Sequence, residues 1–143
     1  MLDNSKITVE KKIKAKKEII WDAFINPDKI KQYLFGTETL CDWAIGSEII
    51  FQGEYQGIAY RDKGVILNKI ENNYLEYSYW SGFTGLADIP ENYAVVKYTI
   101  SENDDTCIVT IEQLGFASEE SRKHAEVTWQ NVLNDIENLC QNN

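Results

Sequence analysis

The segment from Ser118 to Cys140 constrains the fold more than any other part of the chain. Its apolar residues recur at steps of three and four, which is the spacing of one face of an α-helix. They are Ala125, Trp129, Val132, Leu133, Ile136, Leu139 and Cys140. Ser118 stands where a helix N-cap is expected, and Glu119 and Glu120 suit the positive end of the helix dipole. We therefore predict a long C-terminal helix that needs a broad apolar surface to cover one of its faces.

The chain before this helix is predicted to form mostly strands. Residues 7–13 alternate between apolar and polar side chains, as in a strand with one buried face. Two short helices are expected next, at 17–25 and 27–35, because Trp21 and Phe24 share a helical face and Pro27 suits a first helical position. Further strands are predicted at 38–43, 48–55, 58–70, 74–80, 93–101 and 107–114. The short turns between them imply antiparallel pairing.

These elements predict an α+β fold that forms a single domain over residues 1–143. Gly53 and Gly64 lie inside strand patterns, where glycine commonly marks a bulge or sharp curvature. A curled antiparallel sheet of about six to seven strands can then wrap around the C-terminal helix, with two short helices after the first strand. The core is expected between this helix and the sheet. Residues 81–92 stay irregular and form either a lid or an exposed loop.

Composition and charge exclude several classes of function. The 143 residues carry a formal net charge of −9, which argues against binding to nucleic acid or to an anionic membrane surface. The sequence lacks an apolar run of membrane-spanning length and a signal-peptide core, so we expect a cytoplasmic protein without membrane insertion. Cys41, Cys107 and Cys140 are far apart, and His124 is the single histidine. We therefore expect neither a disulfide framework nor a metal site, and no cofactor.

Several short motifs carry a resemblance to a known family. They are IWDAF at 20–24, CDW at 41–43, YRDKGV at 60–65, LEYSYWS at 75–81 and DIPENY at 88–93, with Trp129 in the last helix. With these motifs the sequence resembles the bacterial domains similar to the activator of heat shock protein 90 ATPase. That family lies within the START-like superfamily, which also holds polyketide cyclases, pathogenesis-related plant proteins and lipid-transfer domains. The resemblance covers nearly the whole chain and implies the helix-grip architecture.

The resemblance also implies a cavity between the concave face of the sheet and the C-terminal helix, often occupied by an apolar or amphipathic small molecule. The inward parity of the strands then selects the side chains that would line it. The candidate ligand-binding residues are Phe51, Tyr77, Tyr79, Tyr98, Val109, Ile111, Gln113, Trp129 and Leu133. Tyr79 is preferred over Trp80 because neighbouring residues of a strand face opposite sides. Such an aromatic wall is compatible both with a filled core and with an open pocket.

Candidates for catalysis are few. His124 lies beside the apolar stripe of the last helix, where we expect it to be partly exposed and not catalytic. The charged run at 61–63 is expected to form a structural ion pair or a turn contact, since exposed pairs are common and weak. Asp88 or Asn92 is expected to tie the loop at 81–92 through bonds between side chain and backbone.

Three functions stay open at this point, and a noncatalytic role is favoured over an enzymatic one. The first is a domain that binds a small apolar or amphipathic molecule between the sheet and the last helix. The second is a co-chaperone that contacts a heat shock protein 90 homologue and raises its ATPase rate. The third is a cyclase or dehydratase that uses Tyr77, Tyr98, Gln113 and His124 as polar groups. The sequence identifies neither the ligand nor the oligomeric state.

Overall fold

A single antiparallel sheet forms the body of the computed structural model, which describes residues 2–141. Its strands are β1 (Asp3–Ile13), β2 (Glu38–Leu40), β3 (Glu48–Tyr55), β4 (Ile58–Ile70), β5 (Tyr74–Tyr79), β6 (Ala94–Asn103) and β7 (Thr106–Phe116). They lie side by side in the order β1-β7-β6-β5-β4-β3-β2. Residue 1 and the last two residues of the predicted domain lie outside the described part of the chain.

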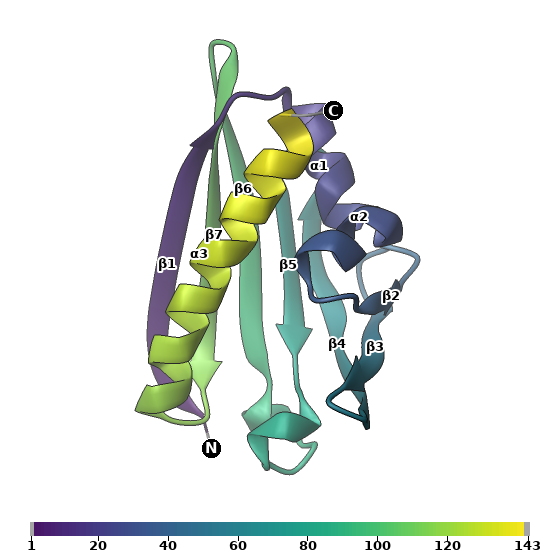
Figure 1. The fold of residues 1–143 in the computed structure, drawn as a ribbon. Coiled ribbons are helices and arrows are strands. Elements are labelled where there is room, and N and C mark those ends of the chain that lie inside the picture. Colours follow the sequence, from purple (N-terminus) through teal and green to yellow (C-terminus); the bar gives the residue numbers. More distant parts are fainter. Residues whose placement is uncertain (1, 142–143) are drawn as a thin grey trace.

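Three α-helices lie on one side of this sheet (Figure 1). They are α1 (Lys17–Ile25), α2 (Pro27–Tyr33) and α3 (Glu119–Gln141). The long helix α3 crosses the concave face diagonally, and α1 and α2 stand beside its C-terminal end. The predicted α+β helix-grip fold is thus confirmed, with a sheet of seven strands and two short helices after the first strand.

The ends of the helices follow the signals that the sequence carries. The Ser118 hydroxyl accepts a hydrogen bond from the Ser121 backbone N–H at 3.1 Å and so acts as the N-cap of α3. At α2, Pro27 occupies the first turn and the Asn26 side chain accepts from the Asp28 N–H at 3.0 Å. Both caps satisfy backbone donors that have no partner inside the helix.

Two predicted elements end early because the backbone turns, and β5 also stops one residue short of its predicted end, at Tyr79. Strand β2 ends at Leu40, and Trp43 adopts a positive φ of 67° while its N–H donates to the Cys41 sulfur. Helix α2 ends at Tyr33 and not at residue 35, because Phe35 and Gly36 both take positive φ values. In contrast, β6 and β7 extend beyond their predicted ends.

Of the two alternatives predicted for Gly53 and Gly64, a bulge or sharp curvature, the bulge is wrong. The pairing of β3 with β4 runs through both positions without interruption, and the register of β4 against β5 shifts only between Ile66 and Asn68. A Cβ atom at Gly64 would lie 1.6 Å from the backbone oxygen of Ser78. At Gly53 it would meet a tyrosine hydroxyl at 2.7 Å. Each glycine therefore allows another group to approach the strand closely.

The hydrophobic core lies between the helices and the concave face, as predicted. Its largest fully buried side chains include Phe24, Ile66, Leu75, Ile111 and Leu133. Each stabilises the fold by about 1.5–3 kcal/mol through its burial. In Figure 1 the short helices stand over the upper part of the sheet, whereas the lower ends of β4 to β6 meet two 3-10 turns, η1 (Gly82–Thr84) and η2 (Pro90–Asn92). The concave face thus has an upper half under the short helices and a lower half near η1.

Candidate functional site

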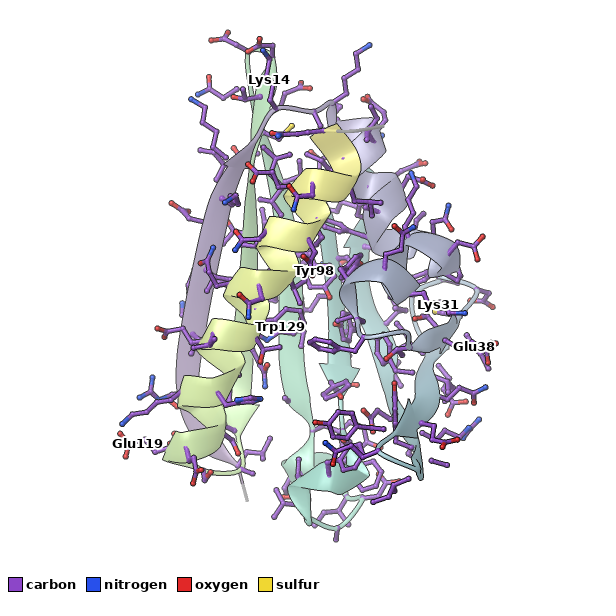
Figure 2. All side chains as sticks on the ribbon, in the orientation of Figure 1. Lys14, Lys31, Glu38, Tyr98, Glu119 and Trp129 are labelled. Atoms are coloured by element: carbon purple, nitrogen blue, oxygen red, sulfur yellow. The ribbon has the colours of Figure 1, made fainter. Side chains whose placement is uncertain are left out.

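Side chains fill the upper half of the space between the sheet and the helices. The ring of Tyr98 lies at the centre, with ring centroids of Phe24, Tyr77 and Trp129 at 4.8, 5.7 and 6.0 Å. Figure 2 labels Tyr98 and Trp129 where α3 crosses the sheet. The void lined by Phe24, Tyr77, Tyr98 and their neighbours measures about 10 Å³, which is room for about one water molecule. This half therefore encloses far less space than the roughly 300–1,000 Å³ of a typical small-molecule pocket.

Tyr77 and Tyr98 meet through their hydroxyl groups inside this core. The two oxygens are 2.9 Å apart, and each tyrosine is only 3% exposed. Burial raises the pKa of both phenols well above the ordinary value of 10.0. The two side chains therefore stay neutral at physiological pH, and they form a hydrogen-bonded pair inside the core.

Gln113 and Trp129 form a second polar contact between the sheet and α3. The Trp129 indole Nε1–H donates to the Gln113 Oε1 at 2.7 Å, and the Gln113 Nε2 donates to the Gly115 carbonyl at 3.3 Å. Both side chains are half-buried. Their mutual hydrogen bond supports packing between α3 and β7, and it occupies the amide oxygen that a ligand would otherwise use.

Three other candidates, Val109, Ile111 and Leu133, are fully buried in the core. Their side chains pack between β7 and α3 and do not line the small void. Their part in ligand binding stays a prediction. His124 is exposed on α3, as expected.

A polar cluster lies in the lower half of the concave face, around Asp62 of β4. Asp62 is 6% exposed, and its Oδ2 accepts a hydrogen bond from the Tyr79 hydroxyl at 2.7 Å. Among residues 2–141 no donor reaches the other carboxylate oxygen, Oδ1. The hydroxyl of Thr39, 3% exposed, is likewise without a partner in the described part of the chain. Two buried oxygens thus have unused hydrogen-bonding capacity.

The register of the sheet brings these two oxygens to the same surface. Thr39 pairs with Phe51 across β2 and β3, and Phe51 pairs with Asp62 across β3 and β4. Residues paired across adjacent strands share a face, so Thr39 and Asp62 flank the Phe51 ring. The Tyr79 ring lies 5.8 Å from that of Phe51, and the concave position predicted for Tyr79 is confirmed. Phe51 and Tyr79 are the two predicted ligand-binding residues at this cluster.

The environment of Asp62 makes its carboxylate an unusual buried group. Burial raises its pKa above the ordinary 3.8, and the hydrogen bond from Tyr79 together with the nearby Ser81 hydroxyl opposes that rise. Its neighbour in the sequence, Lys63, pairs instead with Asp88 at 2.6 Å. The predicted structural ion pair of the run at 61–63 is therefore confirmed for Lys63, whereas the expectation of an exposed contact was wrong for Asp62.

Aromatic side chains cluster at the edge of the lower half, beside the tip of the β3–β4 hairpin. The exposed Phe83 of η1 lies 5.8 Å from the ring of Tyr60 and 6.2 Å from that of Tyr55 at the tip of β3. Tyr60 lies across Gly53, and its hydroxyl meets that of Thr37 at 2.6 Å. We refer to the rings of Tyr55, Tyr60 and Phe83 as the apolar lip of the lower half.

The loop at 81–92 is tied down as expected. The Asn92 side-chain amide donates to the Ala87 carbonyl at 2.9 Å, and the Asp88 carboxylate accepts from the Tyr93 hydroxyl and from Lys63. These bonds lower the pKa of Asp88 below its ordinary value. On the other side of β5 the Trp80 indole donates to the Leu86 carbonyl, so Trp80 belongs to this loop and not to the concave face.

Asp62 and Thr39 are not among the site residues predicted from the sequence, although the strand pattern carries a signal for Asp62. Buried Ile66 anchors the inward parity of β4, and counting back by twos gives Gly64 and then Asp62. The two charged neighbours of Asp62 concealed this alternation. Thr39 lies in a strand of three residues, which is too short to show a pattern.

The described residues give no sign of a metal or redox centre. Cys41 is half-exposed and Cys107 and Cys140 are buried, and all three are free thiols. Burial raises the pKa of the Cys140 thiol to about 11, which makes it unreactive. Residues 2–141 contain no group of three or more His, Cys, Asp and Glu side chains placed to hold a metal ion. Across the same residues, every helix is too short or too polar to cross a membrane.

A curled sheet that grips a C-terminal helix, with an aromatic concave face, defines a START-like helix-grip domain. Within this class, the chain belongs to the family described as Activator of Hsp90 ATPase homolog 1-like protein, whose model matches residues 14–141. The family expected from the sequence motifs is thus confirmed. No curated protein sequence matches the chain.

Solved structures agree with this assignment. The solution structure of a protein from Cytophaga hutchinsonii is 37% identical, with a TM-score of 0.84, and the match covers 99% of this chain and 97% of that one. CalU16 from Micromonospora echinospora is 20% identical over 94% of this chain and 75% of its own, with a TM-score of 0.74. The Aha1 dimer from Colwellia psychrerythraea is 14% identical over 95% and 96%, with a TM-score of 0.75. The last two likenesses concern the fold alone.

Proposed function

We propose that this protein is a noncatalytic, cytoplasmic domain that binds a small amphipathic molecule on the lower half of its concave face. The observation that carries the proposal is the pair of buried oxygens, Asp62 Oδ1 and Thr39 Oγ1, that no described residue satisfies. Buried polar atoms are nearly always hydrogen-bonded, and leaving one unpaired costs about 1–3 kcal/mol. A polar group of a ligand that bonds to either oxygen would remove this cost at that atom.

The apolar part of the ligand would lie against the aromatic rings that surround these oxygens. Phe51 and Tyr79 form the floor, and Tyr60 and Phe83 stand at the lip. Rings of this kind offer a large apolar contact area at a low cost in conformational entropy. Since the upper half is filled, the ligand gains access by moving the exposed Phe83 side chain, and exposed side chains change rotamer within nanoseconds.

Binding without catalysis fits the ionisation behaviour of the site. The hydrogen-bond partner of Asp62 is Tyr79, and burial raises the pKa of this phenol well above 10.0. The pair therefore holds a single carboxylate, and not the two carboxylates with separated pKa values on which acid–base catalysis by a carboxylate pair relies. A cyclase or dehydratase would have to centre on Asp62 and not on the exposed His124.

An NMR titration with neutral amphiphiles tests the proposal. Naphthylethanol and dodecanol are expected to shift the backbone amide signals of Thr39, Phe51, Asp62 and Tyr79. Replacing Thr39 by valine keeps the shape but removes one hydrogen-bonding oxygen, so binding is expected to weaken roughly 2–10-fold. Thr110→Val, on the outer face of β7, is the matched control and should leave binding unchanged. Absence of shifts up to the solubility limit, or shifts confined to the outer face, would overturn the proposal.

The family description favours one further candidate, contact with a chaperone of the heat shock protein 90 type. The nearly filled core is compatible with a partner-binding role, because such a role needs no internal cavity. The test is direct: mixing the protein with a bacterial homologue of this chaperone would raise its ATP hydrolysis. An unchanged rate at saturating protein would exclude this candidate and leave the ligand-binding proposal standing.

A further inference from the structure

The chemistry around Asp62 indicates which polar group a ligand would carry. We infer that the ligand is an amphipathic amine, an inference that rests on the proposed function. Its protonated nitrogen pairs with the Asp62 carboxylate, and its apolar body lies against Phe51 and Tyr79. The inference starts from a buried carboxylate, 6% exposed, whose one hydrogen bond within the described residues comes from Tyr79.

A carboxylate in this setting needs both donors and positive charge. An ionised carboxylate only accepts hydrogen bonds, and it has about four lone-pair sites of which Tyr79 occupies one. Buried charges in proteins are normally paired with an opposite charge. An ammonium group supplies up to three N–H donors and the missing charge together, so it can bond to Asp62 Oδ1 and still offer donors to neighbouring oxygens.

The other charged groups near this strand do not fill that role. Lys63 points away and is held by Asp88 at 2.6 Å, and Arg61 is exposed. The elements packed around Asp62 contribute Thr39 from β2, Phe51 from β3, Tyr79 from β5 and Ser81 beside η1, together with Tyr60 of β4 itself. All of these side chains are uncharged at neutral pH, so the carboxylate faces no fixed cation.

Aromatic rings and the net charge add to the preference for a cation. The faces of phenylalanine and tyrosine rings attract ammonium groups, by about 0.5–1 kcal/mol at exposed sites and more where water is excluded. Phe51 and Tyr79 place two rings 5.8 Å apart beside the carboxylate. The formal net charge of −9 attracts cations over a longer range. A carboxylate or phosphate ligand would be repelled by the same groups.

Two pairs of matched probes test the inference: naphthylethylamine with naphthylethanol, and dodecylamine with dodecanol. Within each pair only the ammonium group is exchanged for a hydroxyl. Hydrogen bonds to charged groups are worth about 1.5–3 kcal/mol, so the amine should bind the wild-type protein roughly tenfold or more tightly than its alcohol, by calorimetry or NMR titration. Asp62→Asn should abolish this preference, whereas Asp105→Asn, the same charge change in the exposed β6–β7 turn, should leave it intact.

Each outcome separates the two claims. Equal binding of amine and alcohol to the wild-type protein would overturn the amine inference and leave the proposed function standing. Failure of all four probes to bind would overturn both. A preference for the amine that survives in Asp62→Asn would place the ammonium elsewhere and overturn the role of Asp62. Because the comparison of amine with alcohol is made first on the wild-type protein, the test does not depend on the folding of a variant.

Discussion

Removing the hydroxyl groups of Tyr77 and Tyr98 by substitution with phenylalanine, singly and together, tests the packing of the upper half of the concave face. The two oxygens are 2.9 Å apart in a region where each tyrosine is 3% exposed. Tyr98→Phe leaves the Tyr77 hydroxyl buried without its partner, and Tyr77→Phe does the converse. Each single change is expected to lower the free energy of unfolding by about 2 kcal/mol.

The double variant should be far less costly than the sum of the single ones. It removes both polar groups together and leaves two apolar rings of nearly the same shape, so we expect a loss of about 1 kcal/mol or less. The two single changes sum to about 4 kcal/mol, which gives an interaction energy of about 3 kcal/mol between the hydroxyls. In thermal unfolding, each single variant should melt roughly 4–8 °C below the wild-type protein.

Urea unfolding followed by circular dichroism measures these energies, and Tyr55→Phe serves as the control because Tyr55 is 57% exposed. The control should stay within about 0.5 kcal/mol of the wild-type protein. Additive single effects, each below about 0.5 kcal/mol, would show that the two hydroxyls do not stabilise each other. That result would mean that water reaches the buried hydroxyls, for instance through the void of about 10 Å³ that Tyr77 and Tyr98 help to line.

Three further predictions address the lower half and the sheet. The pKa of Asp62 is higher in the folded protein than in the unfolded chain, so the unfolding free energy of the wild-type protein falls as the pH rises above 3.8. Asp62→Asn lacks this titration, and it should therefore gain stability relative to the wild-type protein from acid to neutral pH. A difference in unfolding free energy that does not change with pH would contradict this. Phe83→Ala should speed the association of naphthylethanol, measured by stopped-flow fluorescence, because it removes the ring that the ligand must move. Phe35→Ala, which removes an exposed ring elsewhere, should leave the association rate unchanged. Equal effects of the two changes would exclude access past Phe83. Gly64→Ala should lower the unfolding free energy by more than about 3 kcal/mol, because its Cβ would meet a β5 carbonyl at 1.6 Å. Gly82→Ala should be tolerated. Equal stabilities of these two variants would contradict the close approach of β5 to Gly64.

The fold could be predicted because local signals agreed with one another along most of the chain. The predicted bounds of β3, β4 and α1 match the structure, and Ser118 caps α3 as its sequence suggests. In these elements the apolar period, the turn residues and the caps all favour the same structure. The predicted element ends are wrong where a single residue changes the backbone direction. Trp43, with its positive φ, lies inside the predicted strand 38–43, and β2 ends before it, at Leu40.

The site was harder to predict because its position depends on register. The shift between Ile66 and Asn68 reverses the inward parity, so counting from the end of β4 places Asp62 on the wrong face. Thr39 lies at the site because it pairs with Phe51 across β2 and β3. The sequence pattern of a three-residue strand is too short to predict this pairing. Unused hydrogen-bonding capacity is a property of the packed structure, and no sequence pattern carries it.

Nuclear Overhauser effects between bound naphthylethylamine and ring protons of the protein would locate the ligand. We expect contacts from the naphthyl protons to the rings of Phe51 and Tyr79, with the methylene next to the ammonium group nearest to Asp62. Contacts only to exposed apolar residues outside the concave face, such as Phe35 or Val127, would contradict this expectation.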